Sequence, residues 1–501
     1  MSLHRARRTQ AVVGVTAALG LLGAGPALSA GTADSGHSTA VQKLSAAAVG
    51  SVPSNVKLLQ SYRSLLGVHS WYRQMLGGYP VVGGLYARHM DTTGASKGQV
   101  TTWDGRVHAG PLANTKVTIA AASAVKAAAT YTKGTPLTYV KPSLWVLPGA
   151  QSRLVWQVTT QTTARVGASH VSYVDAATGA VLRSYVESKS DGKGGKYVTG
   201  KARTFDPNPV VKLQDESLVD DNDSNKSVPD KGYSIRDLGH LDKSHTLVGE
   251  WAKIVNSDIA SSKNDKYMFM RADDDFEQVM GYYALDTEES YYQDLGFDNV
   301  NAEPQKISTD TIPDDNSYYS PSQDLIVTGT GGVDDAEDPE VTWHEAGHAT
   351  QDAQVPGFGS SEEAGAIGEG FGDYMAVTMG QAYGDDTKLT PTTCVMDWDA
   401  TSYTPPPKHC LRTTDQNKMY PGDLDGEVHD DGEIWSQALY DMNVALGRNK
   451  ATTAIIEGQF KFTPSINMPN AAKVIVDATK KLYGSKAAKQ ATKAFKDRGI
   501  L

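Results

Sequence analysis

Two histidines four residues apart, His344 and His348, lie in the segment 341–348 (VTWHEAGH). On a helix, side chains at this spacing share one face, so both imidazoles can reach a single metal ion. Zinc favours such nitrogen ligands, and Glu345 is placed to take a proton from a zinc-bound water. The segment is therefore predicted to be a helix that carries a zinc site. A surface helix with two ordinary histidines is the alternative.

A catalytic zinc ion needs a third protein ligand and an open position. One common pattern puts a histidine six residues after the second one, but that position is Gln354, which excludes the pattern. Further along, Glu369 and Asp373 are again four residues apart on a predicted helix. Glu369 can bind the ion, and Asp373 can accept the second ring N–H of a ligand histidine, which we expect to be His344.

The two motifs together resemble the gluzincin peptidases of the fungalysin and thermolysin type. The resemblance rests on His-Glu-x-x-His followed, after about twenty residues, by the segment 365–373 (GAIGEGFGD), which is nearer to fungalysin. It implies that Glu369 is the third zinc ligand and that Asp373 supports a ligand histidine. Two features depart from thermolysin: residues 349–368 contain no tyrosine to assist the oxyanion, and Gly368 replaces a common asparagine.

A second block, 426–435 (GEVHDDGEIW), resembles the fungalysin segment that carries the transition-state histidine. The resemblance implies that His429 donates a hydrogen bond to the oxyanion. An acidic neighbour usually orients this histidine, and Asp425 or Asp423 is the predicted partner, between which the sequence does not choose. Arg412 is a further candidate, to hold a substrate carbonyl.

The N-terminal half resembles the pro-region of the same peptidases. Residues 69–91 are similar to the fungalysin/thermolysin propeptide, and 154–185 to a PepSY module. In the family these modules act as inhibitor and folding aid and are then removed. We expect them to cover the site in the unprocessed chain, with a domain boundary in the polar stretch 188–195.

The predicted fold is α+β: a thermolysin-like peptidase of two lobes, one mixed and one helical, preceded by α+β propeptide domains. Helices are predicted at 115–132 and 276–295, and around 470–498 with a break at Gly484. The predicted divisions are a signal peptide (1–30), a poorly ordered leader (31–55), a fungalysin/thermolysin-type propeptide (56–110), a PepSY-like propeptide (111–190), an N-terminal lobe that includes the HExxH helix (191–350) and a C-terminal helical lobe (351–501).

The start of the chain has the layout of a secretory signal peptide. Basic residues at Arg5, Arg7 and Arg8 precede an apolar run at 11–22 and then small residues. The run is too short for a membrane span, so we predict a secreted, extracellular protein without a membrane anchor. In such a protein, Cys394 and Cys410 are expected to form a disulfide bond.

Charge excludes one class of partner. The net charge is −11, and acidic clusters such as Asp273–Asp275 and Asp334-Asp335 interrupt the middle of the chain. A nucleic-acid-binding protein would show a basic surface instead. We interpret the acidic clusters as solvated surface, because no calcium-binding loop pattern is present. Zinc is therefore the one expected cofactor, calcium remains without a motif, and a monomer is expected.

The function predicted from these features is a secreted zinc endopeptidase, made as a zymogen, that acts on proteins or peptides. Two alternatives remain. A zinc aminopeptidase would need a Gly-x-Met-Glu-Asn motif, which is absent. An inactive peptide-binding or chaperone relative would lack Glu345, which is present.

Overall fold

The computed structural model describes residues 42–44, 52–113, 115–136, 141–161, 169–186, 197–298, 300–321, 323–383, 390–403 and 410–501. The predicted signal peptide and the stretch 188–195 lie outside this range, as does most of the predicted leader. Within the described residues, each helix is too short or too polar to cross a lipid bilayer.

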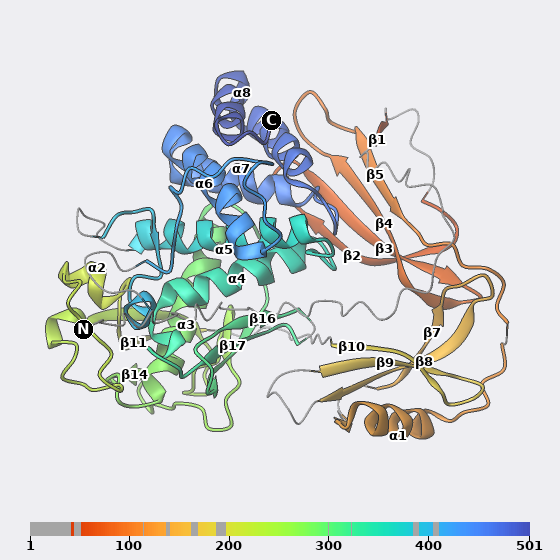
Figure 1. The fold of residues 1–501 in the computed structure, drawn as a ribbon, viewed down its shortest axis with the longest axis horizontal. Helices are drawn as coiled ribbons and strands as arrows, with labels where there is room; N and C mark the ends of the chain where they lie inside the picture. The colour runs from red at the N-terminus through yellow and green to blue at the C-terminus, as the bar shows by residue number, and fades with distance from the viewer. Residues whose placement is uncertain are drawn as a thin grey trace, which may run out of the picture.

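The region before residue 187 is built around one ten-stranded sheet (Figure 1). Its main path runs β1-β5-β4-β7-β8-β9-β10, with β2 on β3, β3 on β4 and β6 on β8. The strands are β1 (Gln42–Leu44), β2 (Val56–Arg63), β3 (Gly67–Leu76), β4 (Tyr79–Asp91), β5 (Val100–Gly105), β6 (Thr135–Pro136), β7 (Ser143–Leu147), β8 (Arg153–Gln161), β9 (Ser169–Asp175) and β10 (Val181–Val186). The two predicted propeptide segments therefore share a sheet, joined where Val81 of β4 pairs with Val146 of β7.

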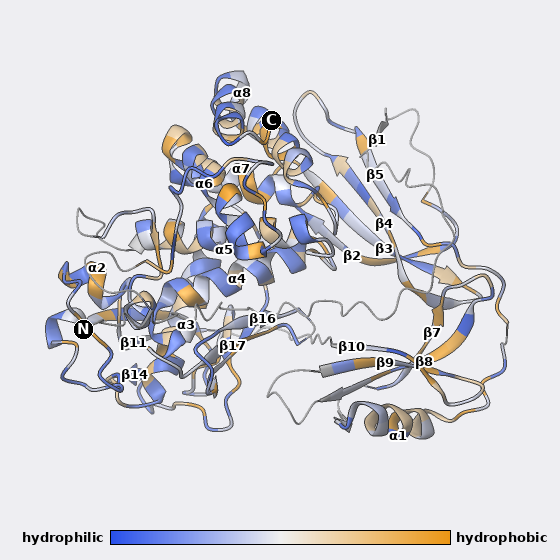
Figure 2. Cartoon of the chain, viewed as in Figure 1, coloured by the Kyte–Doolittle hydropathy of each residue, from blue (hydrophilic) through white to orange (hydrophobic). Residues whose placement is uncertain are grey.

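The second half of this sheet has a helix on one face. Helix α1 (Ala121–Thr132) packs against β8 and β9, where its buried Ala124 and Ala128 contact Val158 and Val174. Small residues on the inner face of the helix let it lie close to the sheet. Apolar residues are frequent along β7 and β8, as Figure 2 shows. The helix predicted at 115–132 is thus present, although it begins later.

The middle of the chain, from 197 to 337, is mixed. It contains a three-stranded sheet in the order β12-β11-β14 and a four-stranded sheet in the order β13-β15-β17-β16. The predicted helix at 276–295 is α3 (Asp275–Asp294). The other elements are β11 (Val198–Thr204), α2 (Pro209–Leu213), η2 (Asp230–Gly232), β12 (Ser234–Leu241), β13 (Ala252–Ile254), β14 (Lys266–Tyr267), β15 (Gln305–Ile312), β16 (Tyr318–Ser320), β17 (Leu325–Gly329) and η3 (Asp335–Glu337).

The remainder is mainly helical. The helices are α4 (Pro339–Gln354), α5 (Glu362–Tyr383), α6 (Val428–Leu446), α7 (Arg448–Gln459) and α8 (Met468–Asp497), with the short elements β18 (Cys394–Val395), η4 (Asp399–Ser402) and β19 (Arg412–Thr413). Helix α8 is broken at Gly484, whose φ of 82° few other residues adopt, as predicted. The predicted lobe boundary at 350/351 falls inside α4. The predicted α+β class is confirmed, with strands dominating the first half and helices the second.

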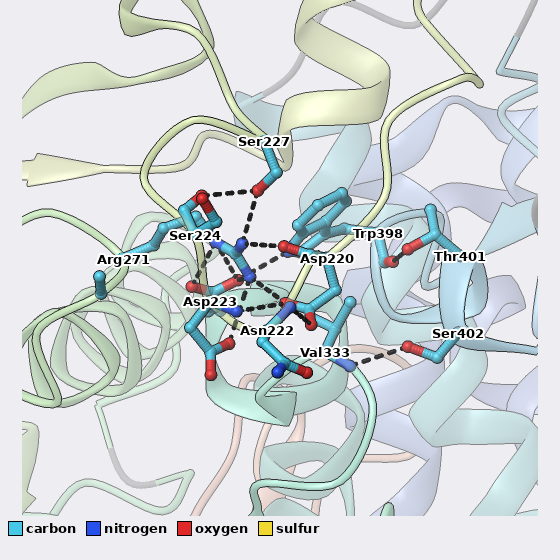
Figure 3. Close-up of polar contacts among 12 residues, drawn as sticks. Asp220, Asn222, Asp223, Ser224, Ser227, Arg271, Val333, Trp398, Thr401 and Ser402 are labelled. Carbon is cyan, nitrogen blue, oxygen red and sulfur yellow. Dashed lines mark hydrogen bonds and ion pairs between the residues drawn. The ribbon is translucent and has the colours of Figure 1, made fainter.

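A buried arginine ties the middle of the chain to the start of α4 (Figure 3). Arg271 is 1% exposed, and its guanidinium donates to Glu337 at 2.8–3.1 Å and to Asp220 Oδ1 at 2.5 Å. Trp398 Nε1 also donates to Glu337, at 2.9 Å, and the Trp398 ring lies against the Arg271 guanidinium. An arginine out of water is stable only with such partners, so this network fixes η3 and η4 relative to each other.

Candidate metal centre

Helix α4 begins where the sequence gives it a cap. Asp338 accepts a hydrogen bond from the backbone N–H of Glu340 at 3.1 Å, and Pro339 occupies the first turn. The other oxygen of Asp338 accepts from the backbone N–H groups of Trp398 and Asp399 at 3.0 and 3.1 Å. The helix is thereby fixed at its start, and its HExxH segment lies inside the protein.

Glycines allow the three site helices to approach closely. A methyl group at Gly347 of α4 would lie 3.1 Å from the Cα of Gly372 in α5. A methyl group at Gly370 would collide with the carbonyl of Gly432 in α6. The glycines of the segment 365–373 therefore bring α5 between α4 and α6, with Glu369 facing the histidines of α4.

The three predicted zinc ligands converge. His344 Nε2 lies 3.2 Å from Glu369 Oε2, and His348 Nε2 lies 3.5 Å from Glu369 Oε1. One ligand atom from each residue lies within 4.8 Å of the others. Glu369 is 1% exposed, and its Oε1 accepts no hydrogen bond. Two imidazole nitrogens and a carboxylate with a buried, unbonded oxygen match the donor set of a catalytic zinc site.

Electrostatics at this point favour positive charge. Burial by itself lowers the pKa of His344, but the hydrogen bonds that its ring donates to Asp373 and Glu369, and the charges of these carboxylates, raise it to about 10. Burial likewise opposes the ionisation of Glu369, yet the neighbouring histidines hold its pKa well below the usual value. The carboxylates of this buried site stabilise positive charge, which suits the binding of a divalent metal ion.

The predicted partner of His344 is in place. Asp373 Oδ1 lies 2.9 Å from His344 Nδ1, which leaves Nε2 turned toward Glu369. Arg412 also binds Asp373, with Nε 2.9 Å from Oδ2 and Nη2 2.8 Å from Oδ1. Burial opposes ionisation of Asp373, but the Arg412 charge and the His344 contact lower its pKa. The proposed substrate contact of Arg412 therefore has to coexist with this ion pair.

The orienting partner predicted for His429 is wrong. His429 Nδ1 lies 2.7 Å from Glu427 Oε1, whereas Asp425 accepts from the backbone N–H of Glu427 at 2.9 Å. The reason is that Glu427 caps α6: its carboxylate also accepts from the backbone N–H groups of His429 and Asp430. Glutamate is not a preferred capping residue, so the sequence carried little signal for this role. His429 Nε2 faces Glu369, 3.3 Å from its Oε2.

A pocket beside these groups is lined by residues from several separate parts of the chain: Asp315, Asn316, Ser317, Asp335, Val341, His344, Glu345, Met396, Asp399, Tyr403, Leu411, Arg412 and His429. Glu345 is 6% exposed and faces this space. The interpretation of Asp334-Asp335 as solvated surface is wrong for Asp335, which is 3% exposed. Asp315, Asp399 and Tyr403 were not identified from the sequence, because they come from separate parts of the chain.

The predicted disulfide bond between Cys394 and Cys410 is present. It connects β18 to the residues that lead into β19, where Cys394 pairs with Thr413. Arg412, on β19, is thereby held next to Asp373. The bond thus supports the wall of the pocket.

The pro-region contacts the peptidase region away from this pocket. None of the described residues before 197 lines this pocket, and coverage of the site by the pro-region stays a prediction. The contact includes α7 and α8, where Asp91 binds Lys461 and Lys481 at 2.6 Å each, and the end of α4, where Gln60 Nε2 donates to the carbonyl of Ala353 at 3.2 Å. Glu457 of α7 accepts from Ser64 Oγ at 2.7 Å and from the backbone N–H of Leu65 at 2.9 Å.

The substitution Gly372→Ala should impair metal binding. Its new methyl group would lie 2.7 Å from His344 Nδ1, so the ring would have to move away from Asp373 and from the other ligands. Alanine stabilises a helix by about 1 kcal/mol relative to glycine, so helix propensity alone would not cause the variant to unfold and lose zinc. We expect the zinc content of the purified protein, measured by mass spectrometry, to fall by at least about tenfold.

Gly368→Ala is the matched control on the same helix, since a methyl group there meets only ordinary contacts at 3.5 Å. Its zinc content should equal that of the wild type. Equal zinc content in both variants would show that the close approach at Gly372 does not position the ligands.

Comparison with known proteins agrees with this geometry. Residues 328–500, which contain every predicted site residue, match the family described as "Fungalysin metallopeptidase (M36)". Residues 118–185 match "Peptidase propeptide and YPEB domain" (PepSY). The predicted resemblance to fungalysin-type metallopeptidases with a PepSY-like pro-region is confirmed.

Two curated fungal proteins also match part of this chain. "Extracellular metalloproteinase 2" of Trichophyton tonsurans and of Arthroderma benhamiae are each 27% identical over 189 residues, which is 32% of this chain and 30% of the relative. The match thus spans less than a third of the relatives' length. A solved precursor of protealysin, a metalloproteinase from Serratia proteamaculans, is 15% identical with a TM-score of 0.38, over 52% of this chain and 91% of that one.

Proposed function

We propose that this protein is a secreted, zinc-dependent endopeptidase made as a zymogen. The observation that carries the proposal is the convergence of His344, His348 and Glu369, with Glu345 and His429 facing the same pocket. Three protein ligands leave a position open for water and substrate, which is the arrangement of a catalytic rather than a structural zinc site.

Each residue at the site has a separate role in peptide hydrolysis. His344, His348 and Glu369 would hold the zinc ion, which acts as a Lewis acid and makes a water molecule more acidic. Glu345 accepts the proton of the attacking water and later passes it to the leaving amine. Asp373 holds His344 in one tautomer through Nδ1, so that Nε2 remains directed at the site.

His429 stabilises the oxyanion. Glu427 Oε1 accepts a hydrogen bond from Nδ1 of His429. When the ring carries a proton on each nitrogen, Nε2 can donate its proton in a hydrogen bond to the oxyanion. The family's usual tyrosine is missing from 349–368, so His429 is proposed to be the main protein donor for the oxyanion.

The zymogen part of the proposal rests on the propeptide match and on the contact with α7 and α8. Burial opposes ionisation of Asp91, but hydrogen bonds from Lys461 and Lys481 lower its pKa. Burial lowers the pKa of Lys461, whereas hydrogen bonding to Asp91 helps to raise that of Lys481, and the contact is proposed to help the helical region fold before the pro-region is removed. Export is supported by the signal-like start of the chain and by the disulfide bond.

Hydrolysis of casein by the secreted protein is the direct test. We expect cleavage at internal peptide bonds, complete loss after treatment with a zinc chelator, and recovery when zinc is added back. Mass spectrometry of the products distinguishes internal cleavage from removal of N-terminal residues. A protein that contains one zinc ion per chain yet cleaves no protein substrate would contradict the proposal.

A further inference from the structure

Three aspartates stand together in the pocket beside the metal centre. Asp315 lies in the loop between β15 and β16, Asp335 begins η3 and Asp399 begins η4. One carboxylate oxygen from each lies within 4.8 Å of the others. The same pocket is lined by Glu345 and His429, so these carboxylates face the space where a bound substrate must pass.

Asp335 and Asp399 are buried, Asp315 is half-buried, and the cluster is incompletely hydrogen-bonded. Asp335 and Asp399 are 3% and 4% exposed. Ser317 Oγ donates to Asp335 at 2.6 Å, but Asp399 Oδ1 and Asp315 Oδ1 are buried atoms without a hydrogen-bond partner. A buried, unbonded carboxylate oxygen is costly, so its retention indicates a ligand that supplies the missing contact.

The negative charge of this cluster is offset only in part, by the charge of Arg412. Arg412 is the arginine of this pocket, and its guanidinium is held by Asp373. Burial, together with the charges of Asp335 and Asp315, raises the pKa of Asp399 well above its usual value. Burial and the Asp315 charge do the same for Asp335. A cation that enters the pocket removes this repulsion.

The pocket walls distinguish between kinds of cation. Besides the three carboxylates, the pocket is lined by the apolar side chains of Val341, Met396 and Leu411. A metal ion would prefer oxygen ligands throughout. Apolar walls that end in carboxylates suit a side chain with an aliphatic stem and a charged tip, as lysine and arginine have.

We propose that Asp315, Asp335 and Asp399 form a specificity pocket for the cationic side chain of a lysine or arginine next to the scissile bond. This inference rests on the proposed peptidase function. The Arg271 network (Figure 3) joins Glu337 of η3 to Trp398, which precedes η4, and so helps to set the separation of Asp335 and Asp399.

Cleavage of peptides tests this proposal. A peptide mixture digested by the secreted protein should show lysine or arginine enriched at one position next to the cleaved bond. Two peptides that differ only in lysine or norleucine at that position then measure the charge effect. We expect kcat/KM to favour lysine by on the order of 100-fold, because carboxylates left unpaired by the neutral side chain oppose its binding.

Variants of two of these aspartates test whether the preference for lysine arises in this pocket. Asp399→Asn, which preserves shape, and Asp315→Asn should each reduce the ratio of lysine to norleucine by about tenfold. Asp314→Asn is the matched control, since this exposed neighbour carries the same charge but does not line the pocket. Its ratio should stay at the wild-type value.

The outcomes separate the two proposals. If both peptides are cleaved at equal rates, or if the ratio does not respond to Asp399→Asn and Asp315→Asn, the specificity pocket is refuted while the peptidase function stands. The specificity pocket is also refuted if the protein binds calcium at this pocket in a titration and cleaves the lysine peptide no faster than the norleucine peptide. If neither peptide nor casein is cleaved, the peptidase function itself fails.

Discussion

Glu345→Gln should lower kcat by about 10³–10⁴-fold while leaving zinc bound, because it removes the group that accepts the proton of the attacking water. Glutamine has the same shape but no basic carboxylate, so the side chain can still occupy its place in the wall of the pocket. The expected result is measured as kcat on a quenched fluorescent peptide. Zinc content per chain is measured by mass spectrometry in parallel.

Glu362→Gln is the control for Glu345→Gln, since it changes the same charge at an exposed position on α5. Its kcat should remain within about twofold of the wild type. Because loss of activity can also stop removal of the pro-region, only chains of equal length are compared. Full zinc content with a kcat close to the wild type in Glu345→Gln would exclude it as the general base.

His429→Phe should lower kcat by about 10²–10³-fold with a small change in KM. Phenylalanine keeps a similar volume but cannot donate a hydrogen bond, so the loss falls on the transition state rather than on substrate binding. The measurement is the separation of kcat from KM on the same peptide. An effect confined to KM would place His429 in substrate binding instead of oxyanion stabilisation.

Two further variants test how His429 is oriented. Glu427→Gln should produce part of the His429→Phe effect, because Glu427 Oε1 contacts the ring at 2.7 Å. Asp425→Asn should have little effect on kcat, since Asp425 contacts the backbone N–H of Glu427 and not the ring. A larger effect at Asp425 than at Glu427 would restore the original prediction from the sequence.

The sequence was most informative where the geometry is local. His344 and His348, like Glu369 and Asp373, are four residues apart, and helical periodicity alone places each pair on one face. The expected contact between His344 and Asp373 follows once the two helices meet. Orientation of His429 was predicted less well, because Glu427, Asp425 and Asp423 are all near in sequence and only the path of the chain into α6 selects among them.

The amino-acid sequence by itself was enough to predict the candidate metal ligands, the proposed general base, the disulfide pair and the proposed order of pro-region and peptidase, since each depends on short spacings or on a recognisable motif. Tertiary structure alone decided what lies around them. Asp315, Asp335 and Asp399 meet only because the fold brings the loop after β15 together with the starts of η3 and η4, and Asp91 meets Lys461 and Lys481 only because the pro-region sheet packs on α7 and α8. Contacts between residues so far apart in sequence depend on the packing of whole elements, which no local pattern encodes.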